Sequence, residues 1–196
     1  MIVIGIIGGI ASGKSFVSAE LERRGARKID ADQIGHEVLK SPPVKKEIRR
    51  RWGESVFRNG EVDRRLLADL LFGNGRPSRI AELNAIVHPV ILTEIEGRLA
   101  AYRAERVPLV VLDAPLLCET GLDALCDRII FVDASFKTRV ARIAGRGWSA
   151  EDLCSRQTEQ MPLEQKRARA DLVIDNNGSP EAIPPQLDSL FPLRNA

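Results

Sequence analysis

Residues Gly8 to Ser15 of this 196-residue chain, GGIASGKS, match the pattern GxxxxGK[ST] at every fixed position. A phosphate chain needs several N–H donors that point to one place, and glycines let the backbone curl closely enough to supply them. Lys14 is expected to neutralise β- and γ-phosphate charge, and Ser15 to bind Mg²⁺ through its hydroxyl. The segment predicts a nucleotide site, with an ordinary glycine-rich turn as the alternative. The expected ATP contacts are Gly8, Gly9, Ile10, Ala11, Ser12, Gly13, Lys14, Ser15 and Phe16.

Three polar positions follow other predicted strands. Asp32 lies near the carboxyl end of the second strand, the edge where open α/β sheets bind ligands. It is a candidate to face a phosphoryl acceptor, and an N-cap for a helix over 33–39 is the alternative. Asp113 closes the third strand, where a carboxylate orients Mg²⁺ or its waters, unless it serves a turn. Asn177 follows the fifth strand and is a candidate adenine contact, although an Asn-Gly turn suits it equally.

The apolar runs that must position these residues predict five strands, at 2–7, 26–30, 108–112, 128–132 and 171–175. Strands that alternate with helices indicate a parallel sheet and an α/β fold. About seventy residues separate the second and third strands, and the helical patterns at 64–72 and 80–103 exceed one crossover helix. They predict an inserted helical region. The basic segment 139–169, broken by Gly145, Gly147 and Pro162, is typical of a mobile segment.

The composition narrows the function classes. The chain has 29 basic and 27 acidic residues, a formal net charge of +2, which gives no general reason to bind nucleic acid. Its three cysteines lack metal-ligand spacing and predict reduced thiols in a cytoplasmic protein. Glycines and Lys14 interrupt the apolar N-terminus, so we expect neither a signal peptide nor a membrane partner.

Several longer motifs occur in an order that resembles the dephospho-CoA kinase family. They are IDAD at 29–32, GEVDRRLLADLLF at 60–72, LNAIVHPVI at 83–91, DAPLLCETGLD at 113–123 and QMPLEQKRARADLVIDNNG at 160–178. The resemblance covers nearly the whole length. It implies ATP-dependent phosphorylation of the ribose 3′-hydroxyl of dephospho-CoA, the last step of coenzyme A biosynthesis, with Mg²⁺.

The resemblance also implies an architecture: the three-layer fold of P-loop kinases with a five-stranded parallel sheet, a helical acceptor-binding insertion and a lid. A single kinase domain would have its core at about 1–40, 107–138 and 170–196, its acceptor region at 41–106 and its lid at 139–169. We expect a monomer or a weak homo-oligomer.

The family's functional residues are carried over by position. Asp32 corresponds to the acidic residue beside the acceptor hydroxyl, and Arg142 and Arg146 are the candidate lid arginines for the phosphates. His88 precedes Pro89, so beginning a helix there is the alternative to an acceptor role. The acceptor-side residues implied are Asp32, Arg64, His88, Leu116, Leu117 and Glu119. The chain departs from common relatives at Ala11, Phe16 and Cys118, of which the last could reshape the acceptor pocket.

Other classes remain as alternatives. A nucleoside or nucleotide monophosphate kinase would share the glycine-rich loop, the lid and the insertion, but not the longer motifs. A GTP-dependent switch is disfavoured because the chain has no NKxD segment, and Asp113 opens DAPL instead of DxxG. A nucleic-acid-binding ATPase would need an extended basic surface.

Overall fold

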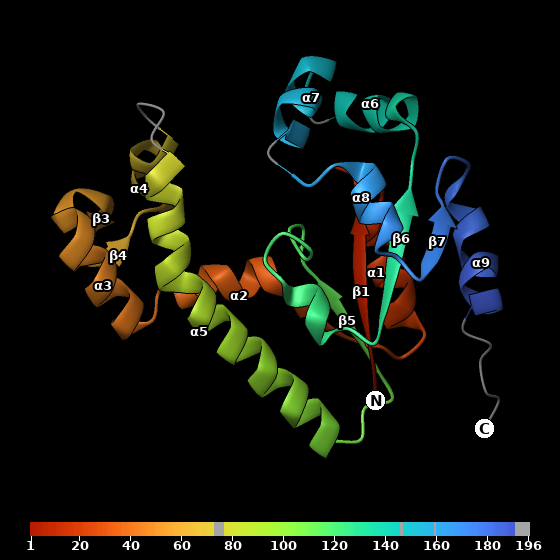
Figure 1. Cartoon of the computed structure of the whole chain (residues 1–196), viewed down its shortest axis with the longest axis horizontal. Helices are drawn as coiled ribbons and strands as arrows, with labels where there is room; N and C mark the ends of the chain where they lie inside the picture. Colours follow the sequence, from red (N-terminus) through yellow and green to blue (C-terminus); the bar gives the residue numbers. More distant parts are fainter. Residues whose placement is uncertain (73–76, 146, 159, 191–196) are drawn as a thin grey trace. The chain divides into compact units, whose positions relative to one another are not determined.

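The computed structural model describes residues 1–72, 77–145, 147–158 and 160–190 (Figure 1). These residues form two compact units. The first contains residues 1–30 and the described residues from 102 onward, and the second contains the described part of 31–101. None of the described helices is long and apolar enough to cross a membrane.

The first unit is built on a five-stranded sheet whose strands are all parallel. In sheet order the strands are β2 (Arg27–Asp30), β5 (Leu109–Asp113), β1 (Ile2–Gly8), β6 (Arg128–Asp133) and β7 (Leu172–Asp175). All five lie where the apolar runs predict them, so that prediction is confirmed. Central strand β1 is buried from Val3 to Gly8 because both faces of the sheet are covered. Its carboxyl end delivers the chain directly to the glycine-rich loop.

Helices cover this sheet on both faces and complete three layers. On one face Val17 and Leu21 of α1 (Lys14–Arg23), together with Leu187 of α9 (Ile183–Leu190), pack on Ile4 and Ile6 of β1. On the other, α8 (Leu163–Ala168) lies near β1. The unit also contains η2 (Leu122–Leu125), α6 (Phe136–Ala144), α7 (Ala150–Thr158) and η3 (Pro180–Ala182).

The second unit is mainly helical, as the excess of helix-forming residues predicts. It contains α2 (Ala31–Val38), α3 (Pro42–Trp52), η1 (Gly53–Val56), α4 (Arg64–Phe72) and most of α5 (Pro77–Ala104). The helices expected at 64–72 and 80–103 are therefore confirmed. A short hairpin of β3 (Phe57–Arg58) and β4 (Glu61–Val62) was not predicted. Asn59 and Gly60 turn it with φ of 53° and 77°, the left-handed values that an Asn-Gly hairpin requires.

Two of the alternatives considered for site residues are wrong. Helix α2 begins at Ala31, so Asp32 lies inside its first turn and does not precede it as an N-cap. Helix α5 runs through His88 and Pro89, so no helix begins there. A proline in a helix interior leaves one carbonyl without its N–H partner. The burial of apolar side chains along α5 offsets that loss. Val87, Ile95 and Leu99 of α5 are all buried.

Candidate functional site

The glycine-rich loop joins β1 to α1 through three left-handed backbone positions. Gly8 has a φ of 149°, Ala11 of 60° and Gly13 of 98°. A Cβ on Gly13 would lie 2.1 Å from the side-chain nitrogen of Asn176, so the loop passes too close to that residue for any side chain. Helix α1 has no acidic residue in its first turn, which leaves the positive end of its dipole available to an anion.

The carbonyl oxygens of this loop are bonded within the chain. Arg142 donates to the carbonyl oxygens of Ser12 at 3.0 Å and Ala11 at 3.4 Å. Asn176, which is buried, donates its amide to the same Ser12 oxygen at 2.7 Å. Arg142 also donates to the backbone and side-chain oxygens of Asn176, at 2.8 and 3.1 Å. Because these carbonyls are held by cationic and amide donors, they are turned away from the concave side of the loop, where a phosphate chain needs N–H donors.

The side chain of Lys14 bonds back to the loop. Its ammonium group donates to the carbonyl oxygens of Gly8 and Gly9, at 3.1 and 3.0 Å. The pKa of Lys14 is lowered to about 8, mainly by burial and then by the neighbouring Lys166 ammonium, while Asp113 opposes the shift. An ammonium in such surroundings gains from any anion that reaches it, so Lys14 is suited to bind phosphate.

The residues predicted to hold magnesium are Ser15, which is exposed on α1, and Asp113, at the end of β5. The carboxylate of Asp113 pairs with Lys28 at 3.0 Å, and Lys28 also pairs with Asp30 at 3.0 Å. Burial alone would lower the pKa of Lys28, but its bonds to Asp113 and Asp30 raise it overall. No cluster of three or more His, Cys, Asp or Glu side chains suited to a metal occurs among the described residues. One hydroxyl and one carboxylate fit Mg²⁺, which takes its other ligands from phosphates and water.

Glu119 forms an ion pair with a buried lysine. Its carboxylate lies 2.8 Å from the ammonium of Lys166, whose side chain is 1% exposed, and accepts the Met161 N–H at 2.9 Å. Burial alone would raise the pKa of Glu119, but the bonds from Lys166 and Met161 outweigh it and lower the pKa. The pair joins α8 to the segment after β5, beside the positive charge of Lys14.

The remaining candidates are distributed between the two units. Asp32, exposed in the first turn of α2, Arg64, exposed at the start of α4, and half-buried His88 belong to the second unit. In the first unit Leu117 is completely buried against Gly5, whereas Leu116 is 41% exposed and has the surface that an acceptor contact needs.

The predicted phosphate and adenine contacts stay predictions. Arg142 holds loop carbonyls, so a direct contact with phosphate stays a prediction, and Arg146 lies outside the described residues. The side chain of Asn177 accepts the Ser135 N–H at 2.7 Å and donates to Asp175 at 2.6 Å, which ties β7 to the start of α6. Its neighbour Asn176 contacts the loop instead.

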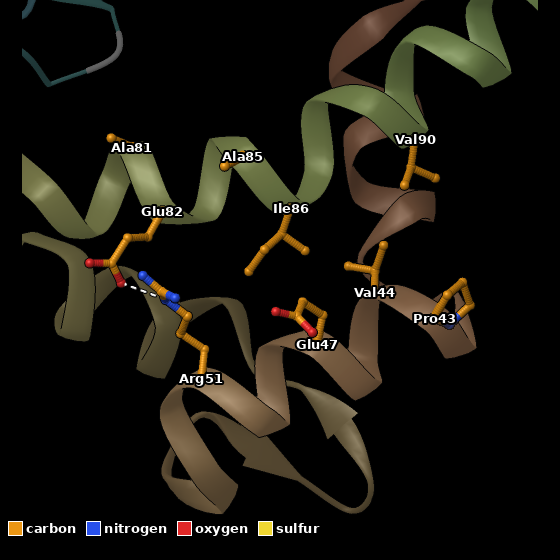
Figure 2. Close-up of a pocket in the computed structure, with 9 residues that line it drawn as sticks. All are labelled: Pro43, Val44, Glu47, Arg51, Ala81, Glu82, Ala85, Ile86 and Val90. Atoms are coloured by element: carbon orange, nitrogen blue, oxygen red, sulfur yellow. Dashed lines mark hydrogen bonds and ion pairs between the residues drawn. The ribbon is translucent and has the colours of Figure 1, made fainter.

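A separate cavity of about 650 Å³ lies within the second unit, between α3 and α5 (Figure 2). Val44 and Ile86 point into the space between the two helices, and Arg51 pairs with Glu82 at 2.8 Å on its wall (Figure 2). Nine residues line it: Pro43, Val44, Glu47, Arg51, Ala81, Glu82, Ala85, Ile86 and Val90. This lining contains no glycine-rich backbone, and its one cationic side chain, Arg51, is already paired with Glu82, so it lacks the N–H cradle that binds a phosphate chain.

Comparisons with known proteins agree with the chemistry of the loop. A family model described as dephospho-CoA kinase matches residues 2–181. The dephospho-CoA kinase of Latilactobacillus sakei is 40% identical over 190 residues, which cover 96% of this chain and 93% of the relative. The crystal structure of TT1252 from Thermus thermophilus has a TM-score of 0.83 at 35% identity and covers 100% of this chain and 98% of its own. Dephospho-CoA kinase from Campylobacter jejuni shares the fold, with a TM-score of 0.65 at 21% identity over 97% of this chain and 95% of its own.

Proposed function

The chain belongs to the dephospho-CoA kinase family, and from this premise we propose how its residues carry out ATP-dependent phosphorylation of dephospho-CoA in coenzyme A biosynthesis. The observation that carries the proposal is the glycine-rich loop. Its carbonyls are bonded within the chain, and its lysine and the start of α1 offer positive charge to an anion. The product would be coenzyme A, phosphorylated on the ribose 3′-hydroxyl.

In the proposed nucleotide site, loop N–H groups and the start of α1 bind the phosphates of ATP. Lys14 exchanges its bonds to the Gly8 and Gly9 carbonyls for the β- and γ-phosphate oxygens. Ser15 and Asp113 would hold Mg²⁺, which neutralises charge on the phosphates when bound. The free thiols Cys118, Cys126 and Cys154 suit a reducing compartment, and we place the reaction in the cytoplasm.

Asp32 is proposed to orient the 3′-hydroxyl of the acceptor and to accept its proton as the hydroxyl attacks. Phosphoryl transfer passes through a loose transition state, so alignment of the hydroxyl contributes more than strong basicity. The first turn of a helix favours a carboxylate in its ionised form, which is the form that can accept a proton. Arg64, His88 and Leu116 are proposed to contact the rest of the acceptor.

The experiment that tests the function measures ADP release by the purified protein with ATP and Mg²⁺. The candidate acceptors compared are dephospho-CoA, coenzyme A, AMP, CMP and nucleosides, and mass spectrometry identifies the product. We expect strong stimulation by dephospho-CoA alone and a product heavier by one phosphoryl group. Stimulation by a nucleotide or nucleoside alone would leave the nucleotide site in place and overturn the acceptor.

The role of Asp32 is tested by Asp32→Asn, which keeps the shape of the side chain and removes its basic oxygen. We expect turnover to fall by about 100-fold or more while ATP affinity stays nearly unchanged. Glu37→Gln is the matched control, since Glu37 is an exposed acid of the same helix. Near-normal turnover of Asp32→Asn would reduce Asp32 to a structural residue of α2.

A further inference from the structure

Arg139 is an arginine of α6 that the fold buries almost completely. The residue is only 3% exposed. Its guanidinium forms no ion pair within 4 Å among the described residues. One terminal nitrogen donates to the side-chain oxygen of Gln157 on α7 at 2.5 Å. The Nε–H group is buried and has no hydrogen-bond partner among the described residues. A buried donor without a partner is unfavourable, and for a charged group the loss is larger.

The guanidinium of Arg139 lies directly against the glycine-rich loop. A Cβ on Gly9 would be 2.9 Å from its terminal nitrogen and 3.2 Å from its central carbon, so the guanidinium packs on the Gly9 backbone where any other residue would place a side chain. Lys14 donates to the carbonyl oxygen of the same Gly9, and Arg139 is one of the cations that lower the pKa of Lys14. Two positive side chains therefore meet at the Gly9 end of the loop.

The other arginine of α6 that reaches the loop is used differently. Arg142 has four acceptors, on Ala11, Ser12 and Asn176, and these fix the loop's carbonyl groups. Arg139 has one neutral acceptor and an unpartnered Nε–H. A guanidinium presents five donors in a fork that matches phosphate oxygens, so Arg139 retains capacity for an anion that Arg142 has already committed.

We propose that Arg139 is a phosphate-binding residue, which turns from the Gln157 amide to the β- and γ-phosphate oxygens of the nucleotide that the loop holds. The inference rests on the proposed nucleotide site and adds a contact to it. Because Gln157 belongs to α7 and Arg139 to α6, the exchange also releases one bond between these two helices when a polyphosphate binds.

The test compares Arg139→Met with Lys137→Gln, an exposed residue of the same helix whose substitution also removes one positive charge. Calorimetric titrations with ATP and with AMP, which lacks the β- and γ-phosphates, need no acceptor. We expect Arg139→Met to weaken ATP binding by about 10- to 100-fold and AMP binding by less than about twofold. Lys137→Gln should leave both affinities near those of the original protein.

Thermal unfolding separates this role from a structural one. Arg139→Met replaces a buried cation that has no ion-pair partner among the described residues with an apolar side chain, so the nucleotide-free protein should keep or raise its unfolding midpoint, and ATP should raise that midpoint less. Unchanged ATP affinity, or equal losses for ATP and AMP, would overturn the proposal.

If Arg139→Met does not fold, the test uses the NMR resonance of the Arg139 Nε–H group in the original protein. The substitution Arg139→Lys removes this resonance and so assigns it. The resonance should shift with ATP and with inorganic tripolyphosphate but not with AMP, and an unchanged resonance would overturn the proposal. Failure of dephospho-CoA to stimulate ADP release would overturn the proposed acceptor alone, since these measurements contain no acceptor.

Discussion

Asn176 should contribute more to the stability of this protein than its neighbour Asn177, and alanine substitutions test the difference. In Asn176→Ala the chain loses a buried amide bond to the Ser12 carbonyl at 2.7 Å and an arginine bond from Arg142 at 3.1 Å. A neutral bond contributes about 1 kcal/mol and a charged one about 1.5–3 kcal/mol. Arg142 keeps its bonds to the backbone oxygens of Ser12 and Asn176, which favours the lower value for the charged bond. We expect the free energy of unfolding to fall by about 2–4 kcal/mol.

Asn177→Ala is the matched control because the two side chains are chemically identical and adjacent. Asn177 is exposed, and its bonds to Ser135 and Asp175 compete with water, so we expect a loss of about 1 kcal/mol or less. Urea denaturation followed by circular dichroism measures the free energy of unfolding of both variants, and titration with ATP measures how tightly the loop binds nucleotide. Asn176→Ala should weaken ATP binding by about tenfold, since an unrestrained loop must be ordered on binding.

The reasoning would be refuted by a stability loss below about 0.5 kcal/mol in Asn176→Ala, because buried hydrogen bonds of this geometry contribute more than that. It would also be refuted by an unchanged ATP affinity in Asn176→Ala. Either result would mean that the carbonyl side of the loop needs no support from β7.

Three further predictions concern single positions. The pKa of Lys14 is lowered to about 8 from 10.5, so the unfolded chain binds more protons in that interval and stability contributed by Lys14 rises with pH there. Since phosphate prefers the ammonium form, ATP affinity should fall by about tenfold per pH unit above about 8, and a flat profile to about pH 9.5 would contradict this. Ala11→Gly should raise the free energy of unfolding by about 0.5–1 kcal/mol in urea denaturation, because Ala11 has a φ of 60°, and a decrease would contradict the argument. Lys28→Met removes the cation from Asp113, so the Mg²⁺ concentration for half-maximal turnover should fall by about threefold or more, whereas an unchanged requirement would separate Asp113 from the metal.

The fold was predictable where the signal is local. The five strands are short apolar runs and the loop is a contiguous motif, so neighbouring residues alone specify them. The hairpin at Asn59 and Gly60 also carries a local signal, an Asn-Gly pair, that the prediction overlooked. The alternative that a helix begins at His88, before Pro89, was wrong because tertiary packing, as well as the backbone, decides whether a helix continues through a proline.

The loop residues were candidates from their motif and Arg142 from the family resemblance, but the bonds that hold the loop carbonyls were not predicted. Asn176 and Arg142 reach the loop from 164 and 130 residues away, and no sequence spacing encodes such contacts. Arg139 and Arg142 are three residues apart on one helix, and only their burial and partners distinguish them. The role of a basic residue near a phosphate site therefore depends on which acceptors surround it in the folded protein.

The bonds that hold the loop carbonyls have a consequence for the order of folding. The loop is made before the side chains that fix it, which belong to α6 and to the residue after β7. Residues 8–15 alone cannot keep the binding shape, since the carbonyl oxygens of Ala11 and Ser12 would bond to water until both partners had docked. A ribosome-bound chain should therefore acquire ATP binding in a single step, when β7 joins the sheet.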